Sequence, residues 1–132
     1  MEKRPAVRIL VVDDFEPFRR FVCSALKRIS DLHIVGEASD GLEAIQRAGE
    51  LQPDLIVLDI GLPTLDGLEA ARRIRHLSPN SRILMVSQES SADVVQEAFS
   101  LGWGYVAKTN AATDLLPAVE AVILGKRFVS GT

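Results

Sequence analysis

The chain of 132 residues alternates short apolar runs with longer segments of helical spacing, and this alternation limits the folds that it can adopt. Five runs rich in Val, Ile and Leu predict buried strands at 6–12, 32–38, 55–58, 83–86 and 105–107. After each run, apolar residues recur at intervals of three and four positions, which predicts a helix. The helices are expected near 18–29, 40–48, 68–77, 93–101 and 115–123.

Five strand–helix units in succession are typical of an α/β protein, in which helices cover both faces of a parallel sheet. Because crossover connections are right-handed, the predicted fold is a flavodoxin-like, doubly wound sheet of five parallel strands in the order 2-1-3-4-5. We assign residues 1–125 to this single domain and residues 126–132 to a C-terminal tail or the start of a linker. The 47% of apolar residues is enough for one core.

Composition also excludes several classes of function. The net charge of −3 arises from interspersed acidic and basic residues without a basic stripe, so we expect no direct binding of nucleic acid by this domain. A single cysteine, Cys23, excludes an internal disulfide and is expected to be buried filler in the first helix. No apolar run approaches the ~20 residues that span a membrane, so we expect a soluble cytoplasmic protein with no membrane partner.

Four of the five predicted strands end next to a polar residue that can take part in chemistry. In a doubly wound sheet, ligands bind beyond the carboxyl ends of the strands, so these side chains are expected to share one crevice. Taken singly, each is an ordinary turn residue, helix cap or solvated charge. Together they indicate a functional site, because each follows a predicted strand at the equivalent position of its strand–helix unit. These residues are Asp13, Asp14, Asp59, Ser87 and Lys108.

Three carboxylates in one crevice repel one another unless a cation shares the site or some are protonated. Carboxylate oxygens suit Mg²⁺, Mn²⁺ or Ca²⁺ rather than zinc, and Mg²⁺ is the expected ion. Asp59 stands alone after the central strand, so it is the candidate nucleophile that would hold a phosphoryl group as an acyl phosphate. Lys108 can pair with a phosphate oxygen, and the Ser87 hydroxyl can donate a hydrogen bond to another.

Four short segments together carry a resemblance to a known family. They are VVDD at 11–14, LDIGLPTLDG at 58–67, VS at 86–87 and YVAK at 105–108. These segments resemble the receiver (CheY-like) domain of two-component response regulators, and the resemblance runs from residue 8 to residue 129. The stretch 118–130 is similar to the last helix and exit of the NarL-type (LuxR-type) subgroup.

This resemblance implies that Asp59 accepts a phosphoryl group from the phosphohistidine of a sensor histidine kinase. It implies that Mg²⁺ is held by Asp13, Asp14, Asp59 and the backbone carbonyl of Gly61. The domain would then be a switch and not an enzyme, apart from its own phosphotransfer and slow autodephosphorylation.

The resemblance also assigns the parts of the switch. Lys108 pairs with the phosphoryl group, Ser87 binds it and moves with it, and Tyr105 turns inward in response. The surface of the fourth helix, fifth strand and fifth helix would then change and control dimerisation or an output. In this subgroup the output is usually a DNA-binding transcriptional domain, so the sequence is either a fragment cut at the linker, which we favour, or a stand-alone receiver. Without the resemblance, the favoured interpretation of Tyr105 is a plain edge-strand aromatic.

Two departures keep an alternative open. Gln88 follows Ser87 where the family usually has a small residue, and the connection that contains Trp103 is one residue shorter than usual. The ring of Trp103 is either a partner surface or a cover for its own loop. The alternative function is a degenerate receiver that acts as a phosphorylation-independent protein-interaction module.

Two further alternatives fit the residues less well. A phosphatase of the haloacid dehalogenase type needs a second acid two residues after its nucleophile, where Gly61 stands. A flavodoxin-like cofactor binder would meet repulsion between a phosphate and the carboxylates of Asp13 and Asp14. His33 and His76 both fall away from the predicted crevice, so neither is a candidate ligand or phosphodonor.

Overall fold

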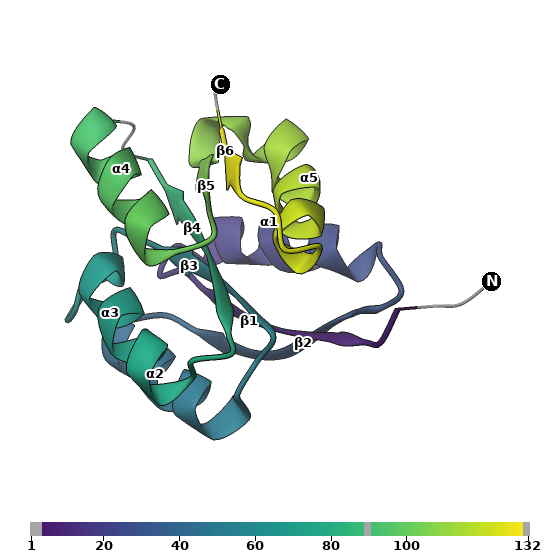
Figure 1. The fold of residues 1–132 in the computed structure, drawn as a ribbon, viewed down its shortest axis with the longest axis horizontal. Coiled ribbons are helices and arrows are strands. Elements are labelled where there is room, and N and C mark those ends of the chain that lie inside the picture. The colour runs from purple at the N-terminus through teal and green to yellow at the C-terminus, as the bar shows by residue number, and fades with distance from the viewer. Residues whose placement is uncertain (1–3, 89–90, 131–132) are drawn as a thin grey trace.

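A computed structural model describes residues 4–88 and 91–130, which form a parallel sheet covered by helices on both faces (Figure 1). The strands are β1 (Val7–Val12), β2 (Leu32–Ala38), β3 (Leu55–Asp59), β4 (Arg82–Ser87), β5 (Gly104–Ala107) and β6 (Phe128–Val129). The helices are α1 (Glu16–Lys27), α2 (Gly41–Leu51), α3 (Gly67–Leu77), α4 (Ala92–Leu101) and α5 (Ala111–Ile123). A 3₁₀ turn, Lys108–Asn110, joins β5 to α5.

The sheet has six strands in the order β2-β1-β3-β4-β5-β6, and every neighbouring pair is parallel. The predicted order of the first five strands is therefore confirmed, whereas the predicted number of five is wrong. The additional strand has only two residues, which is too short to show a strand period in the sequence. It follows Gly125, whose φ of 79° lets the chain turn back from α5 toward β5.

The strand β6 lies in the segment 126–132 that we predicted to be a tail or the start of a linker. It pairs Phe128 with Gly104 and Val129 with Tyr105, and the Ser130 amide donates to the Tyr105 carbonyl at 2.9 Å. The strand β5 is therefore not an edge strand, and the side chain of Tyr105 is 1% exposed. The interpretation of Tyr105 as an edge-strand aromatic is wrong for this reason.

Two apolar layers, one on each face of the sheet, hold the helices in place. The strand period of two divides β1, so that Ile9 and Val11 face α1 and α5 while Leu10 and Val12 face α2, α3 and α4. Cys23 lies in the first of these layers, and burial raises the pKa of its thiol to about 11. The prediction that Cys23 is buried filler is confirmed.

The helical spacing located the helices but not every buried contact. Leu42, Leu77 and Phe21 are apolar residues within the predicted helices, yet they are 55%, 51% and 38% exposed. In α2 the close contact with the core is made by Ala44 and Ala48 instead, because small side chains let the helix approach its neighbours. Within the described residues, no helix is both long enough and apolar enough to cross a membrane.

A chain that ends at Gly125 should be less stable than the 132-residue chain by about 1–3 kcal/mol. It loses the β5–β6 pairing, and Tyr105 loses the strand beside it. Urea unfolding of the two chains measures the difference. A chain that ends at Ser130 keeps each of these contacts and serves as the control. Equal stability of all three chains would support a domain boundary at residue 125.

Candidate functional site

The carboxyl ends of β1, β3, β4 and β5 meet at a pocket with a volume of about 340 Å³. The predicted residues come together there, as the topology requires of the ends of parallel strands. The pocket is lined by Asp14, Phe15, Asp59, Gly61, Ser87, Gln88 and Lys108. Asp13 lies directly beside it, and one carboxylate oxygen from each of Asp13, Asp14 and Asp59 lies within 4.8 Å of the others.

Two of the three carboxylates accept hydrogen bonds from backbone amides. One Asp13 oxygen, Oδ1, accepts a hydrogen bond from the Phe15 amide at 2.8 Å, and one Asp59 oxygen, Oδ1, accepts from the Gly61 amide at 3.2 Å. Asp13 and Asp59 are buried, whereas Asp14 is exposed. A cluster made only of oxygen donors, partly buried and open to the pocket on one side, has the chemistry of a site for a hard divalent cation.

Lys108 supplies the positive charge nearest to this cluster. Its Nζ atom lies 2.9 Å from Asp13 Oδ2 and 3.6 Å from Asp59 Oδ2, and its side chain is 10% exposed. One ammonium group opposes three carboxylates, so the cluster as a whole remains negative. The pocket can therefore still attract a cation.

The pKa of the Asp59 carboxyl group is raised to about 6, so folding disfavours its charged form. Burial is the largest cause, and the charge of Asp13 adds to it. The ammonium of Lys108 and the amide of Gly61 act in the opposite direction without cancelling the shift. Asp59 is thus a buried carboxylate whose negative charge is only partly compensated.

The segment after Asp59 is a tight turn that returns the chain to α3. The Ile60 amide donates to the Val86 carbonyl at 2.9 Å, and the Gly67 amide donates to the Ile60 carbonyl at 2.8 Å. A Cβ atom on Gly67 would lie 2.2 Å from the Asp59 carbonyl oxygen, so only glycine fits at this position. The turn keeps Gly61 at the rim of the pocket, next to Asp59.

Ser87 and Tyr105 lie on neighbouring strands. Ser87 ends β4, is 3% exposed, and pairs in register with Ala107 of β5, the residue that precedes Lys108. Tyr105 pairs with Met85 and is buried in the layer that contains Ala98 of α4. Ser87 is therefore connected to Tyr105 and α4 through neighbouring residues of β5.

Residues 9–120 match the family described as the response regulator receiver domain. This chain belongs to that family. The response regulator protein VraR of Staphylococcus aureus is 36% identical to it over 121 residues, which cover 91% of this chain and 58% of VraR. VraR of Staphylococcus saprophyticus is 35% identical over 115 residues, which cover 86% of this chain and 55% of that protein. The receiver chain thus matches little more than half the length of these relatives.

Solved structures support the same assignment and the subgroup. A two-component response regulator of the LuxR family from an Aurantimonas species superposes with a TM-score of 0.90 at 33% identity, over 96% of this chain and 91% of that one. The receiver domain of the putative response regulator NarL from Mycobacterium tuberculosis gives 0.86 at 31% identity, over 93% and 100%. The resemblance to NarL/LuxR-type receivers is confirmed, and response regulators are signalling switches, not enzymes in the ordinary sense.

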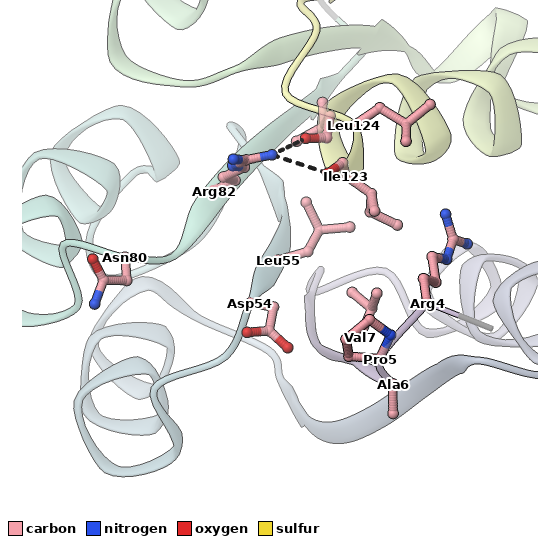
Figure 2. Close-up of a pocket in the computed structure, with 11 residues that line it drawn as sticks. Arg4, Pro5, Ala6, Val7, Asp54, Leu55, Asn80, Arg82, Ile123 and Leu124 are labelled. Atoms are coloured by element: carbon pink, nitrogen blue, oxygen red, sulfur yellow. Dashed lines mark hydrogen bonds between the residues drawn. The ribbon is translucent and has the colours of Figure 1, made fainter. Parts of the chain in front are cut away.

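The larger pocket of the receiver lies at the opposite end of the sheet and does not contain the acidic cluster (Figure 2). It has a volume of about 430 Å³, and its charged side chains bind within the chain. Arg82 donates to the carbonyls of Val122 and Ile123 at 2.7 and 3.0 Å, and Arg4 forms ion pairs with Asp31 and Glu120. These contacts hold the end of α5 and the N-terminal segment in place, so we interpret the charged side chains of this pocket as structural.

Two aromatic residues at the receiver site were not found by sequence reasoning. Phe15 lines the pocket and is 56% exposed, and Phe18 places its ring centroid 4.6 Å from Lys108 Nζ. Apolar spacing in the predicted helix at 18–29 indicates a core contact for Phe18 but not its contact with Lys108. The ring of Trp103 is half-buried and lies against the guanidinium of Arg82 at 4.7 Å, which favours the loop-covering interpretation over a partner surface.

Asp59→Asn should stabilise the metal-free receiver near neutral pH by about 1–2 kcal/mol, because it removes a buried charge from a negative cluster. A carboxyl group whose pKa is raised by folding stabilises the fold at low pH, and this contribution is lost as the pH rises through the folded value. The gain should therefore shrink between neutral pH and about pH 4, the range set by the shift to about 6.

Urea unfolding at a series of pH values without divalent cations measures this difference. Asp93→Asn, which changes an exposed carboxylate in the first turn of α4, should show no such pH-dependent gain. An Asp59→Asn protein that is no more stable than the unchanged chain at neutral pH would contradict the electrostatic account.

Proposed function

We propose that this receiver domain is a phosphorylation-activated switch that accepts a phosphoryl group from a sensor histidine kinase onto Asp59. The observation that carries the proposal is the environment of Asp59: a buried carboxylate whose charge is only partly compensated, beside two further acids and a lysine at one pocket. A nucleophile, a cation site and a cationic partner for phosphate are the groups that phosphoryl transfer to a carboxylate requires.

In the proposed reaction, an Asp59 carboxylate oxygen attacks the phosphorus of phosphohistidine. The new O–P bond forms as the P–N bond breaks, and the histidine nitrogen leaves with the bonding electron pair and is protonated from solvent. The product is an acyl phosphate on Asp59. Hydrolysis by water later releases inorganic phosphate and restores the carboxylate, which is the slow autodephosphorylation expected of the domain.

The proposed cation is Mg²⁺, held by Asp13, Asp14, Asp59 and the backbone carbonyl of Gly61. When bound, Mg²⁺ would offset the charge of the carboxylates and of the transferring phosphoryl oxygens. The fit rests on the donor set, which consists of oxygen atoms at the rim of an open pocket.

The other site residues are proposed to bind the phosphoryl group and to report its presence. Lys108 would pair with one phosphoryl oxygen, since its ammonium already lies 3.6 Å from Asp59 Oδ2. The Ser87 hydroxyl would donate a hydrogen bond to another phosphoryl oxygen. Ser87 would move toward the phosphoryl group, and the Tyr105 side chain would move in response. This coupling is a shift between two conformations, and its size is set by the difference in phosphate contacts between them.

The output is proposed to act through the surface of α4, β5 and α5. Phosphorylation would change this surface and promote formation of a homodimer. The receiver domain itself is proposed not to contact nucleic acid, and transcription would be controlled through a DNA-binding domain of the same protein. The proposal assigns the reaction to the cytoplasm, a reducing compartment in which a free cysteine such as Cys23 is ordinary.

The chain incubated with acetyl phosphate and Mg²⁺ should gain the mass of one phosphoryl group, measured on the intact protein by mass spectrometry. Asp59→Asn should gain none, because an amide does not form an acyl phosphate. Asp93→Asn should gain the same mass as the unchanged chain, since this carboxylate lies on α4 and outside the pocket. Omission of Mg²⁺ should remove most of the gain.

A folded chain that binds Mg²⁺ but gains no mass from acetyl phosphate would next be tested with a phosphorylated histidine kinase. Failure with both donors would refute the switch. It would favour the second candidate function, a degenerate receiver that binds partners without phosphorylation, which the unusual Gln88 keeps open.

Gln88→Ala should shorten the lifetime of the acyl phosphate and speed its formation from acetyl phosphate, each by roughly 2- to 10-fold. Gln88 lines the pocket next to Ser87, and its side chain is exposed, so its removal opens the pocket to water and to a small donor. Decay of the phosphorylated mass with time measures the lifetime. Gln96→Ala, an exposed position on α4, is the matched control, and an unchanged lifetime in Gln88→Ala would contradict the screening role.

A further inference from the structure

Phe18 lies in α1 and faces the lysine of the site. Its ring centroid lies 4.6 Å from Lys108 Nζ, within the range of a cation–π contact. The same ring packs against the apolar layer between the sheet and α1 and α5. Among the described residues, the Lys108 ammonium contacts the Asp13 carboxylate at 2.9 Å, the Asp59 carboxylate at 3.6 Å and the Phe18 ring.

We propose that Phe18 is a positioning residue that keeps the Lys108 ammonium beside Asp59 when a divalent cation binds to the carboxylates of the acidic cluster. This inference rests on the proposed function, because it assigns a role in the same phosphoryl transfer. Phe18 acts through Lys108 and does not itself touch the reacting atoms.

A divalent cation would compete with Lys108 for the carboxylates. Asp13 and Asp59, which now bind Lys108, are also members of the oxygen cluster that suits a divalent cation. A cation bound there would weaken both ion pairs and repel the ammonium. The contact with Phe18 is the one of these three that a metal does not share, so it remains when the cation binds.

The position of Phe18 is itself fixed to the site. The Phe15 amide donates to the Asp13 carboxylate at 2.8 Å, and Arg19 donates from Nη1 to the Asp13 carbonyl at 2.8 Å. Arg19 also forms an ion pair with Glu37 at the end of β2. Residues on both sides of Phe18 are thus bonded to Asp13 or to its neighbouring strand, so the part of α1 that carries the ring is fixed relative to the acidic cluster.

The test uses Phe18→Leu, which keeps an apolar side chain but removes the aromatic face, and Phe18→Tyr, which restores the face. Phe21→Leu is the matched control, because Phe21 lies on the same helix, packs against Phe18 at 5.7 Å between ring centroids, and is 38% exposed. The initial rate of phosphorylation is measured against acetyl phosphate concentration at saturating Mg²⁺. The side-chain methylene proton resonances of Lys108 are recorded by NMR with and without Mg²⁺.

Phe18→Leu should lower the phosphorylation rate by about 3- to 10-fold, while Phe18→Tyr and Phe21→Leu should stay within about twofold of the unchanged chain. In the unchanged chain, ring-current shifts should move the Lys108 methylene protons upfield, and this shift should persist when Mg²⁺ is added. It should be lost in Phe18→Leu alone. A general packing role would not give rescue by tyrosine together with this spectroscopic signature.

Three results would overturn the inference: a normal rate in Phe18→Leu, a rate in Phe18→Tyr as low as in Phe18→Leu, or loss of the upfield shift when Mg²⁺ binds the unchanged chain. The last result needs no phosphorylation. If the unchanged chain takes up no phosphoryl group, the proposed function fails, whereas persistence or loss of the Lys108 shift still decides whether Phe18 holds the lysine.

Discussion

Repulsion among Asp13, Asp14 and Asp59 is the constraint on which the rest of this site depends. The backbone imposes it, because β1 and β3 are neighbours in the sheet and deliver their terminal carboxylates to the same edge. Packing of the apolar layers on both faces of the sheet offsets the free-energy cost of this repulsion, because it fixes the strands and therefore the positions of their ends. Lys108 offsets part of the charge, and burial together with the charge of Asp13 still keeps the pKa of Asp59 raised.

The same arrangement explains why so much of the site could be predicted from the sequence. Apolar runs locate the strands, the crossover rule orders them, and the carboxyl-end rule then assigns Asp59, Ser87 and Lys108 to one pocket without any knowledge of side-chain contacts. The β6 strand escaped this reasoning because two residues cannot display a period, and its pairing depends on the turn at Gly125. The exposed Leu42 also escaped, since helical spacing does not say which apolar residue the neighbouring helix covers.

The β6 strand and the residues next to it form part of the face made by α4, β5 and α5. Arg127 donates to carbonyls of Phe99 and Gly102 at the end of α4, and the Ser130 hydroxyl donates to Asp114 of α5 at 2.7 Å. The segment around β6 therefore bonds to the helices on both sides of β5 and to Tyr105 itself. A displacement of the β5 backbone at Tyr105 would have to move this segment or break its contacts, so the energetics of the face include the chain beyond α5.

The proposed switch requires Lys108 to stay near Asp59 in states with very different charge. Salt bridges alone serve this purpose poorly, because their strength depends on the charge that the site is built to change. A contact with an aromatic face is weaker, but it depends on ring geometry and not on the protonation or metal occupancy of the carboxylates. The placement of Phe18 beside Lys108 combines both kinds of contact, so the ammonium is held by a carboxylate pair in one state and by the ring in both. Sequence reasoning missed this pairing because helical spacing records only that Phe18 faces inward, whereas the lysine it meets arrives from the end of β5, far along the chain.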